Sequence, residues 1–461
     1  MSATAERDTA RRTRVPDNEV GPTLADPSPR TLGFWDIVAL WGNLGVSLLG
    51  PVAALFVLAP TGTRMSLFAA TVAVLVGSII GLLPVGYCAL AGARSGQPAM
   101  VLLRGLFGSR LSWLPTALNI LQCLGWGVFE LVVIASAAQQ LLPWDTRWVY
   151  VLVGGVLTTL MALRPLGVVR LLRRYAVVAV SLSMLYFLVQ FAREPLPGFT
   201  HGGWTGFWVA VDAVIAVSIS WVPLAADYTR HARTDRGAFS GTMAGYSITQ
   251  IACYVLGLLA YSTVVHGSAD SALFTAFIAV PFGWLPFAIF VLRELDESFT
   301  NVYSTVVSVQ NLRPLWDRRV LAVVVGTITT LGALALHIDD YQNFLYLIGS
   351  VFIPMSAVFI VDFFLFGRAR GWDVSAGAPT RWMMVLPWAL GFCAYQLINP
   401  GQVDPSKPGF IDWWVHSWTG LQSWLHFTPQ GWMSASVISF VVAAVATLPA
   451  GLNRRRRRES C

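Results

Sequence analysis

The chain has 461 residues, of which 55% are hydrophobic and only 12% charged, and its formal net charge is +7. Soluble domains carry about 25% charged residues, so this composition excludes a soluble protein and predicts an all-α polytopic membrane protein. The positive charge requires no nucleic-acid partner, because the placement of the basic residues along the chain accounts for it.

Twelve apolar segments follow a polar stretch, residues 1–30, which we expect to be a disordered cytoplasmic tail without a cleavable signal peptide. A helix that crosses a bilayer needs roughly 20 apolar residues. We expect spans near 33–59, 66–92, 111–142, 147–163, 171–192, 207–228, 240–265, 284–310, 319–336, 342–366, 382–399 and 432–450.

The basic residues predict the orientation. If the amino end is cytoplasmic, 26 of the 31 Lys and Arg residues fall on the cytoplasmic side. This bias recurs at every alternate loop, which supports an even number of spans and two cytoplasmic termini in the cell (inner) membrane. The basic tail, residues 451–461, is interpreted as a topology anchor beside anionic lipid. The Trp-rich loop near 400–431 is expected outside, as an aromatic belt or interfacial helix.

The first span is interrupted near its middle. Gly42 and Gly45 flank Asn43, and Gly50-Pro51 follows. Pro51 is expected to remove another backbone hydrogen bond and so free the carbonyl of Ser47. Irregular backbone at membrane depth is tolerated only where it is buried in protein or lines a cavity. The alternative for the two glycines is a close helix-packing seam.

The sixth span carries a similar interruption, with Ser220 and Trp221 just before Pro223. Spans one and six lie five spans apart, so the second runs in the opposite direction across the membrane. This pattern predicts two inverted repeats, residues 31–192 and 207–366, with the binding site between the broken helices. Residues 382–450 would add two further helices.

The third span carries Glu130 near its middle, one helical turn after Trp126. A carboxylate there costs at least roughly 2.5–3.5 kcal/mol, so it must face protein, water or a ligand. An indole and a carboxyl on one helix face would suit a flat, nitrogen-rich molecule.

The eighth span places Arg293, Glu294, Asp296 and Glu297 near its centre. Arg293 can pair with Glu297 or Asp296 on the same helix. The oxygen-rich stripes that continue through Thr300 and Asn301 would suit Na⁺, or a carboxylate could carry a proton. Alternatively, Arg293 and Glu294 lie in the outer interface and the span starts after Asp296.

No metalloprotease, phosphate-loop or nucleophile-elbow motif is present, which counts against a membrane enzyme or an ATP-driven pump. The cysteines show no metal-ligand or disulfide spacing, and the four within apolar runs are expected to be small buried residues: Cys88, Cys123, Cys253 and Cys393.

Five motifs in order give the chain a family resemblance over roughly residues 31–400. They are Trp41-Gly42-Asn43-Leu44-Gly45; Ser95-Gly96-Gln97-Pro98 with Arg104 and Phe107-Gly108; Gly125-Trp126; Ser220-Trp221-Val222-Pro223-Leu224 followed by Asp227-Tyr228-Thr229-Arg230; and Asn301-Val302-Tyr303-Ser304. The chain resembles the nucleobase:cation symporter-1 family of cytosine, purine, uracil, thiamine and allantoin permeases.

The resemblance implies a leucine-transporter-type fold of two inverted five-helix repeats plus two C-terminal helices, and alternating access coupled to Na⁺ or H⁺. No other cofactor and no obligate protein partner are expected beside the substrate, the cation and membrane lipids. The resemblance also implies substrate-binding and cation-binding residues. The substrate would meet Asn43, Gly45, Trp126, Glu130, Ser220, Trp221 and Asn301, with the two tryptophans enclosing the ring. The cation would meet Leu44 backbone, Asp296, Glu297 and Thr300.

Glu130 falls where the family often has an amide. A carboxylate suits a ring with an amino group beside a ring nitrogen, so hydroxymethylpyrimidine or cytosine is the expected substrate of this symporter. The alternatives are a purine, allantoin or hydantoin permease and an amino-acid or amine carrier on the same fold. A channel or a membrane-embedded enzyme is the alternative from a different class.

Overall fold

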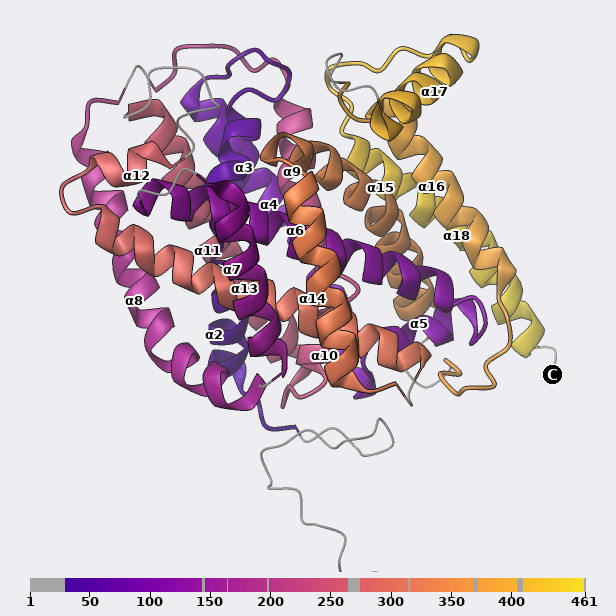
Figure 1. Cartoon of the computed structure of the whole chain (residues 1–461). Helices are drawn as coiled ribbons and strands as arrows, with labels where there is room; N and C mark the ends of the chain where they lie inside the picture. The colour runs from indigo at the N-terminus through magenta and orange to yellow at the C-terminus, as the bar shows by residue number, and fades with distance from the viewer. Residues whose placement is uncertain are drawn as a thin grey trace, which may run out of the picture.

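The computed structural model shows a helical protein (Figure 1). It describes residues 30–142, 146–163, 165–196, 199–263, 274–313, 316–367, 372–403 and 409–459, without the side chains of 165–177, 307, 310, 311, 339, 367 and 451–459. Residues 1–29 of the predicted amino-terminal tail and the side chains of the basic tail therefore lie outside the described part. No β-sheet occurs among the described residues.

Helices occupy all twelve segments that the hydropathy predicts. In chain order the helices are α2 (Phe34–Leu44), α3 (Leu49–Leu58), α4 (Leu67–Ser95), α5 (Ala99–Phe107), α6 (Trp113–Leu141), α7 (Arg147–Leu163), α8 (Pro165–Arg193), α9 (Phe207–Ile219), α10 (Ala225–Thr229), α11 (Asp235–Thr263), α12 (Thr275–Ala279), α13 (Trp284–Leu312), α14 (Arg318–Ala335), η2 (Ile338–Asp340), α15 (Tyr341–Ile360), η3 (Val361–Gly367), η4 (Trp382–Met384), α16 (Val385–Ile398), α17 (Phe410–Trp424) and α18 (Ala435–Glu459).

Membrane crossing is supported by length and composition for part of this set. Five described helices are long and apolar enough to span a bilayer, and six are if α2 and α3 form one bent span. Five further apolar helices are shorter. The protein is thus a multi-pass membrane protein, while the count of twelve crossings stays a prediction.

The interruption of the first span is confirmed. The axes of α2 and α3 differ by 67° across the break, which comprises Gly45 to Leu48. Pro51 was expected to disrupt the span further and to free the carbonyl of Ser47. Instead Pro51 lies in the first turn of α3, where an N–H has no intrahelical partner anyway, and the Ser47 carbonyl accepts from Gly50 N at 3.2 Å.

The interruption of the sixth span is also confirmed, because α9 ends at Ile219 and α10 begins only at Ala225. Tight turns join them: Trp221 N donates to the Ser218 carbonyl at 3.2 Å and Val222 N to the Ile219 carbonyl at 2.9 Å. This break leaves Ser220 and Trp221 between the two helices, where their side chains and carbonyls can face a cavity.

Small residues let α2 approach α11 closely. A Cβ on Gly245 would lie 2.5 Å from the Val38 carbonyl oxygen, and one on Gly45 would lie 2.2 Å from Thr249 Oγ1. Both distances are well inside van der Waals contact. The face of the first span that contacts α11 is therefore a close helix-packing seam, and the same span is also broken after α2.

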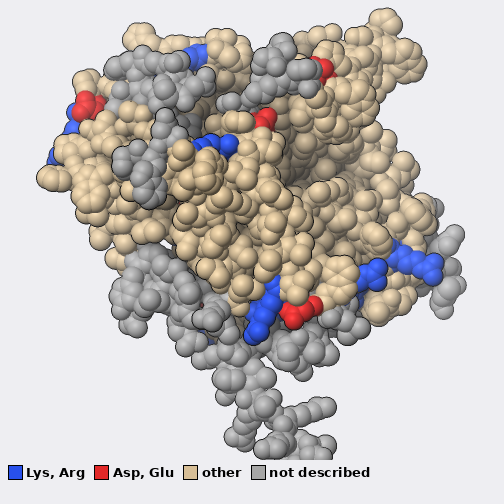
Figure 2. All heavy atoms as spheres, in the orientation of Figure 1, with Lys and Arg blue, Asp and Glu red and all other residues tan. Residues whose placement is uncertain are grey.

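The outer surface suits a lipid environment. On the face shown in Figure 2, charged side chains gather toward the upper and lower parts, and a broad band between them carries none. Exposed apolar side chains cover α7 and α14, for example Val156 and Leu331. Cys393 on α16 is exposed rather than buried, because it faces outward from the helix pair that α16 forms with α18.

Candidate functional site

The two helix breaks border one cavity of about 610 Å³, a volume that includes open solvent at its mouth. Its walls come from both breaks, from α6 and α13 and from the middle of α11, with Tyr341 closing it at the start of α15. The lining residues are Leu44, Gly45, Ser47, Leu49, Gly50, Gln122, Cys123, Trp126, Val217, Ser220, Trp221, Leu224, Tyr246, Gln250, Cys253, Tyr254, Glu297, Asn301 and Tyr341.

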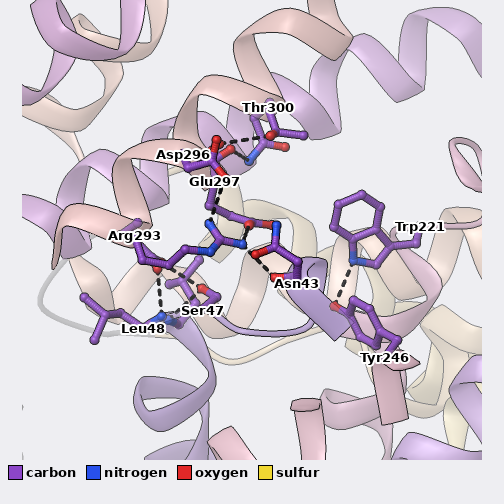
Figure 3. A network of polar contacts seen from close by, with 12 residues as sticks. Asn43, Ser47, Leu48, Trp221, Tyr246, Arg293, Asp296, Glu297 and Thr300 are labelled. Carbon is purple, nitrogen blue, oxygen red and sulfur yellow. Dashed lines mark hydrogen bonds and ion pairs between the residues drawn. The ribbon is translucent and has the colours of Figure 1, made fainter. Parts of the chain in front are cut away.

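Two tryptophans supply flat apolar surface to the cavity. Trp126 on α6 packs edge-on against Tyr341 and Phe344, with ring centroids 5.9 and 5.4 Å apart. Trp221, in the second break, donates from Nε1 to the Tyr246 hydroxyl at 2.8 Å (Figure 3). These contacts fix the orientation of both indoles, as a stacking surface requires.

Several polar atoms of the cavity-lining residues have no hydrogen-bond partner. Gln122 Oε1, Trp126 Nε1 and the hydroxyls of Tyr254 and Tyr341 are buried without a hydrogen-bond partner. A buried polar atom left unpaired costs about 1–3 kcal/mol. The wall therefore holds one amide acceptor and one indole donor, with two hydroxyls that can do either, ready for a polar ligand.

Five of the seven predicted substrate-binding residues line the cavity: Gly45, Trp126, Ser220, Trp221 and Asn301. Asn43 does not, and its carbonyl accepts a hydrogen bond from Arg293. Glu130 does not either, although its side chain is only 2% exposed. Its carboxyl contacts Glu294 instead.

Two of the four predicted cation ligands, Asp296 and Glu297, pair with the guanidinium of Arg293, which also reaches the first break. Arg293 Nη2 donates to the Asn43 carbonyl and to Glu297 Oε2, both at 2.7 Å, and Nη1 lies 3.7 Å from Asp296 Oδ2. Thr300 Oγ1 donates to the carbonyl of Asp296 at 2.9 Å. Figure 3 shows Arg293 between the break and the acidic turn of α13.

Glu294 joins α13 to the start of α3. Its carboxylate accepts from Ser47 Oγ at 2.7 Å and from Leu48 N at 2.9 Å. A negative charge at a helix N-terminus is favoured by the helix dipole and the free N–H groups. Arg293 and Glu294 are 3% and 0% exposed, so both side chains are buried within the protein, and the alternative that they lie at the depth of the outer interface stays open.

Sequence reasoning missed two amides in the cavity wall. Gln122 precedes Trp126 by one turn on α6, and its Nε2 donates to the Ser220 carbonyl at 2.8 Å. Gln250 on α11 accepts from Ser218 Oγ at 2.9 Å. The spacing of Gln122, Trp126 and Glu130 at successive fourth positions was the available signal, because such residues share one helix face.

This arrangement defines a class of protein, a membrane transporter with two interrupted helices around a buried polar cavity. The family follows from comparison. The model of the permeases for cytosine/purines, uracil, thiamine and allantoin matches residues 26–375, and the chain belongs to this family. The resemblance drawn from the five motifs is thus confirmed.

Named relatives and solved structures agree with this assignment. The chain is 24% identical over 343 residues to the cytosine permease of Escherichia coli (strain K12), covering 72% of this chain and 79% of the permease. It is 24% identical over 340 residues to YxlA of Bacillus subtilis (strain 168), provisionally named a purine-cytosine permease, covering 69% and 73%. These relatives are permeases and not enzymes.

The fold matches that of Mhp1. The inward-facing structure of Mhp1 superposes with a TM-score of 0.71 at 15% identity, covering 95% of this chain and 94% of Mhp1. Mhp1 is a nucleobase-cation-symport-1 family transporter. Its closed conformation with bromovinylhydantoin bound superposes with a TM-score of 0.68 at 17% identity, covering 93% of this chain and 95% of Mhp1. At this identity the match establishes the fold alone.

Proposed function

We propose that this protein is a cation symporter that imports a small nitrogenous ring compound by alternating access. The first candidates are aminopyrimidines such as hydroxymethylpyrimidine and cytosine. The observation that carries the proposal is the set of unpaired donors and acceptors in a tryptophan-walled cavity between two helix breaks. Membership in the nucleobase permease family supports the same substrate class.

The free atoms of the wall complement an aminopyrimidine edge. Gln122 Oε1 can only accept, so it suits an amino group or a ring N–H. Trp126 Nε1 can only donate, so it suits a ring nitrogen or carbonyl. A stacked base gains about 1–3 kcal/mol from an aromatic neighbour, which either indole can supply.

The reason for favouring an amino-substituted ring moves from Glu130 to Gln122. Glu130 lies outside the lining, whereas Gln122 presents an acceptor to the cavity. A purine, allantoin or hydantoin ring also offers donors and acceptors and remains the second candidate class. An amine carrier is disfavoured, because an ammonium group would need a free carboxylate in the cavity. Glu297 is the acidic residue among the described lining residues, and its carboxylate already pairs with Arg293 at 2.7 Å.

Transport by this architecture requires two interrupted helices that run in opposite directions. We propose inverted repeats over residues 31–192 and 207–366, twelve crossings in all, two more helices in 382–450, and cytoplasmic termini. The start of α2 and the end of α18 both lie at the lower end of the molecule in Figure 1. This supports a location of both termini on the same side of the membrane. The bias of basic residues toward alternate loops supports the cytoplasmic side.

Uptake competition tests the substrate class. Purified protein in proteoliposomes, or cells that express it, should take up radiolabelled cytosine or hydroxymethylpyrimidine saturably, and unlabelled uracil, allantoin and hydantoin should compete more weakly. Competition by uracil without competition by any amino-substituted ring would contradict the aminopyrimidine proposal. The absence of saturable uptake of every ring would contradict the transport function.

The Gln122→Leu variant tests whether Gln122 causes the preference for amino-substituted rings. The change keeps a similar side-chain volume but removes the acceptor. The loss of one hydrogen bond should weaken cytosine binding by about 1–3 kcal/mol, which lowers its apparent affinity about 5- to 150-fold. Rings without an amino group beside a ring nitrogen should lose less apparent affinity in this variant. An equal loss for all rings would instead indicate a structural role through the Ser220 carbonyl.

A further inference from the structure

At the end of the cavity that the proposed orientation places outside, α3 and α15 meet. Tyr341, in the first turn of α15, lines the cavity and is 0% exposed. Its ring centroid lies 6.2 Å from that of Phe56 on α3 and 5.9 Å from that of Trp126 on α6. A substrate can therefore pass Tyr341 at this end only if α3 and the start of α15 move apart.

One exposed residue, Gln402, joins these two helices beyond their contact. Its side-chain Nε2 donates to the Pro60 carbonyl, just after the end of α3, at 2.8 Å. Its backbone N–H donates to Asn343 Oδ1 at 2.8 Å, and its carbonyl accepts from Asn343 Nδ2 at 2.9 Å. Asn343 lies in the same turn of α15 as Tyr341, and Pro60 lies one turn after Phe56. Gln402 thus ties the two helices together next to the contact between Phe56 and Tyr341.

The backbone before Gln402 is shaped for this contact. Gly401 has a φ of +117°, which residues with a side chain rarely adopt. A Cβ on Gly401 would also lie 2.8 Å from Asn343 Oδ1. Asn399 accepts from Gly401 N through Oδ1 at 3.3 Å, and its own N–H donates to the Tyr395 carbonyl at the end of α16. The turn is therefore fixed to α16 and presents Gln402 as a tether rather than as a slack loop.

We propose that Gln402 and Asn343 form an outer strap that holds α3 to α15, and that this strap must open before a substrate enters the cavity past Tyr341. The inference rests on the proposed transport function and deepens it, because it names residues that control entry to the same cavity. Gln402 is not among the described lining residues, so it is a positioning residue that acts through Asn343. Exposed hydrogen bonds contribute little net free energy, so the strap can open and close repeatedly.

Access to Cys253, which lines the cavity and is 1% exposed, measures the opening without any substrate. A small charged methanethiosulfonate reagent that does not cross membranes is added to intact cells that express the full-length protein. Mass spectrometry gives the reaction rate of Cys253. Gln402→Ala removes the bond to the Pro60 carbonyl and should raise this rate about 2- to 10-fold. Asn343→Ala, which frees the turn from α15, should also raise it, and an unchanged rate in either variant would overturn the inference.

The double variant separates a strap from two independent structural contacts. Gln402 reaches the Pro60 carbonyl from a turn that Asn343 holds, so the two contacts act in series. The double variant Gln402→Ala/Asn343→Ala should therefore react no faster than Gln402→Ala alone. Independent contributions would multiply the two fold-changes, and that result would contradict a single strap.

Gln422→Ala is the matched control. The Gln422 amide also donates to a backbone carbonyl, that of Leu397 at 2.9 Å, but it joins α17 to α16 and does not reach α3. This variant should leave the reaction rate of Cys253 unchanged. A rise equal to that of Gln402→Ala would indicate general loosening of the outer loops and would overturn the inference.

The outcomes separate this inference from the proposed function. If rings are transported but the strap variants leave the rate at Cys253 unchanged, the inference fails and the transport function stands. If no ring is transported while the strap variants expose Cys253 as expected, the proposed function fails and the strap between α3 and α15 stands.

Discussion

At the scale of single residues, the cavity combines fixed aromatic surface with free hydrogen-bonding atoms. Trp126 and Trp221 are held by neighbouring aromatic groups, while Gln122 and Trp126 keep one polar atom each without a partner. Because these atoms border one cavity, a polar ligand bound there could pair with them.

Trp126→Ala should weaken all transported rings rather than select among them. Stacking depends on the face of a ring and not on its edge, and its loss costs about 1–3 kcal/mol. The apparent affinity measured by uptake should therefore fall about 5- to 150-fold for each compound. Trp126→Phe retains an aromatic face and should lose clearly less. A selective loss for one ring, or none, would place the stacking surface elsewhere.

The sequence predicted the face of α6 correctly but not the depth of each residue along it. Trp126 and Glu130 share a face, and one turn of an α-helix is 5.4 Å long. That distance carries Glu130 past the cavity to Glu294, and it brings Gln122 into the wall. Helical periodicity contains no information about where a neighbouring helix breaks, so depth could not be predicted.

At the scale of elements, two helix breaks and a seam of small residues determine the site. Both breaks could be predicted, because glycine, asparagine, serine and proline within apolar runs signal irregular backbone. The pairing of Arg293 with Glu297 and Asp296 was predicted from their spacing and is confirmed. The contact of Arg293 with the Asn43 carbonyl could not be, because it joins residues 250 positions apart in the sequence.

Gly245→Ala tests the seam between α2 and α11. The added Cβ would lie 2.5 Å from the Val38 carbonyl oxygen, so α2 must shift. Overpacking of this kind typically costs about 1–3 kcal/mol, seen as a lower midpoint of thermal unfolding in detergent. Gly420→Ala on α17 meets nothing within 4 Å and should leave the midpoint unchanged or raise it, because alanine favours a helix. Equal midpoints for both variants would contradict the close approach.

At the scale of the whole molecule, the charged ends and the apolar band describe a protein set across a bilayer (Figure 2). Composition alone predicted this environment, and the alternating basic loops predicted the orientation. The family match over residues 26–375 agrees with the five motifs. The substrate could not be predicted at this scale, because it depends on the few free atoms in one cavity.

Labelling of single cysteines tests the orientation. In a background without native cysteines, Thr61→Cys in the loop after α3 should react with a membrane-impermeant maleimide in intact cells. Ala376→Cys, in the loop before η4, should react only after permeabilisation. Both positions are exposed, so access to the reagent and not burial decides the result. The reverse pattern would invert the topology, and reaction of both in intact cells would contradict an odd number of crossings between them.

The most direct test of the binding cavity uses two cysteines that already line it. Cys123 and Cys253 are 1% exposed and border the cavity, whereas Cys393 is exposed on α16. Alkylation by N-ethylmaleimide, followed by mass spectrometry, gives the reaction rate of each thiol with and without a transported ring. The ring should slow alkylation of Cys123 and Cys253 and leave Cys393 unchanged. A ring that is transported but protects neither thiol would show that the substrate binds elsewhere.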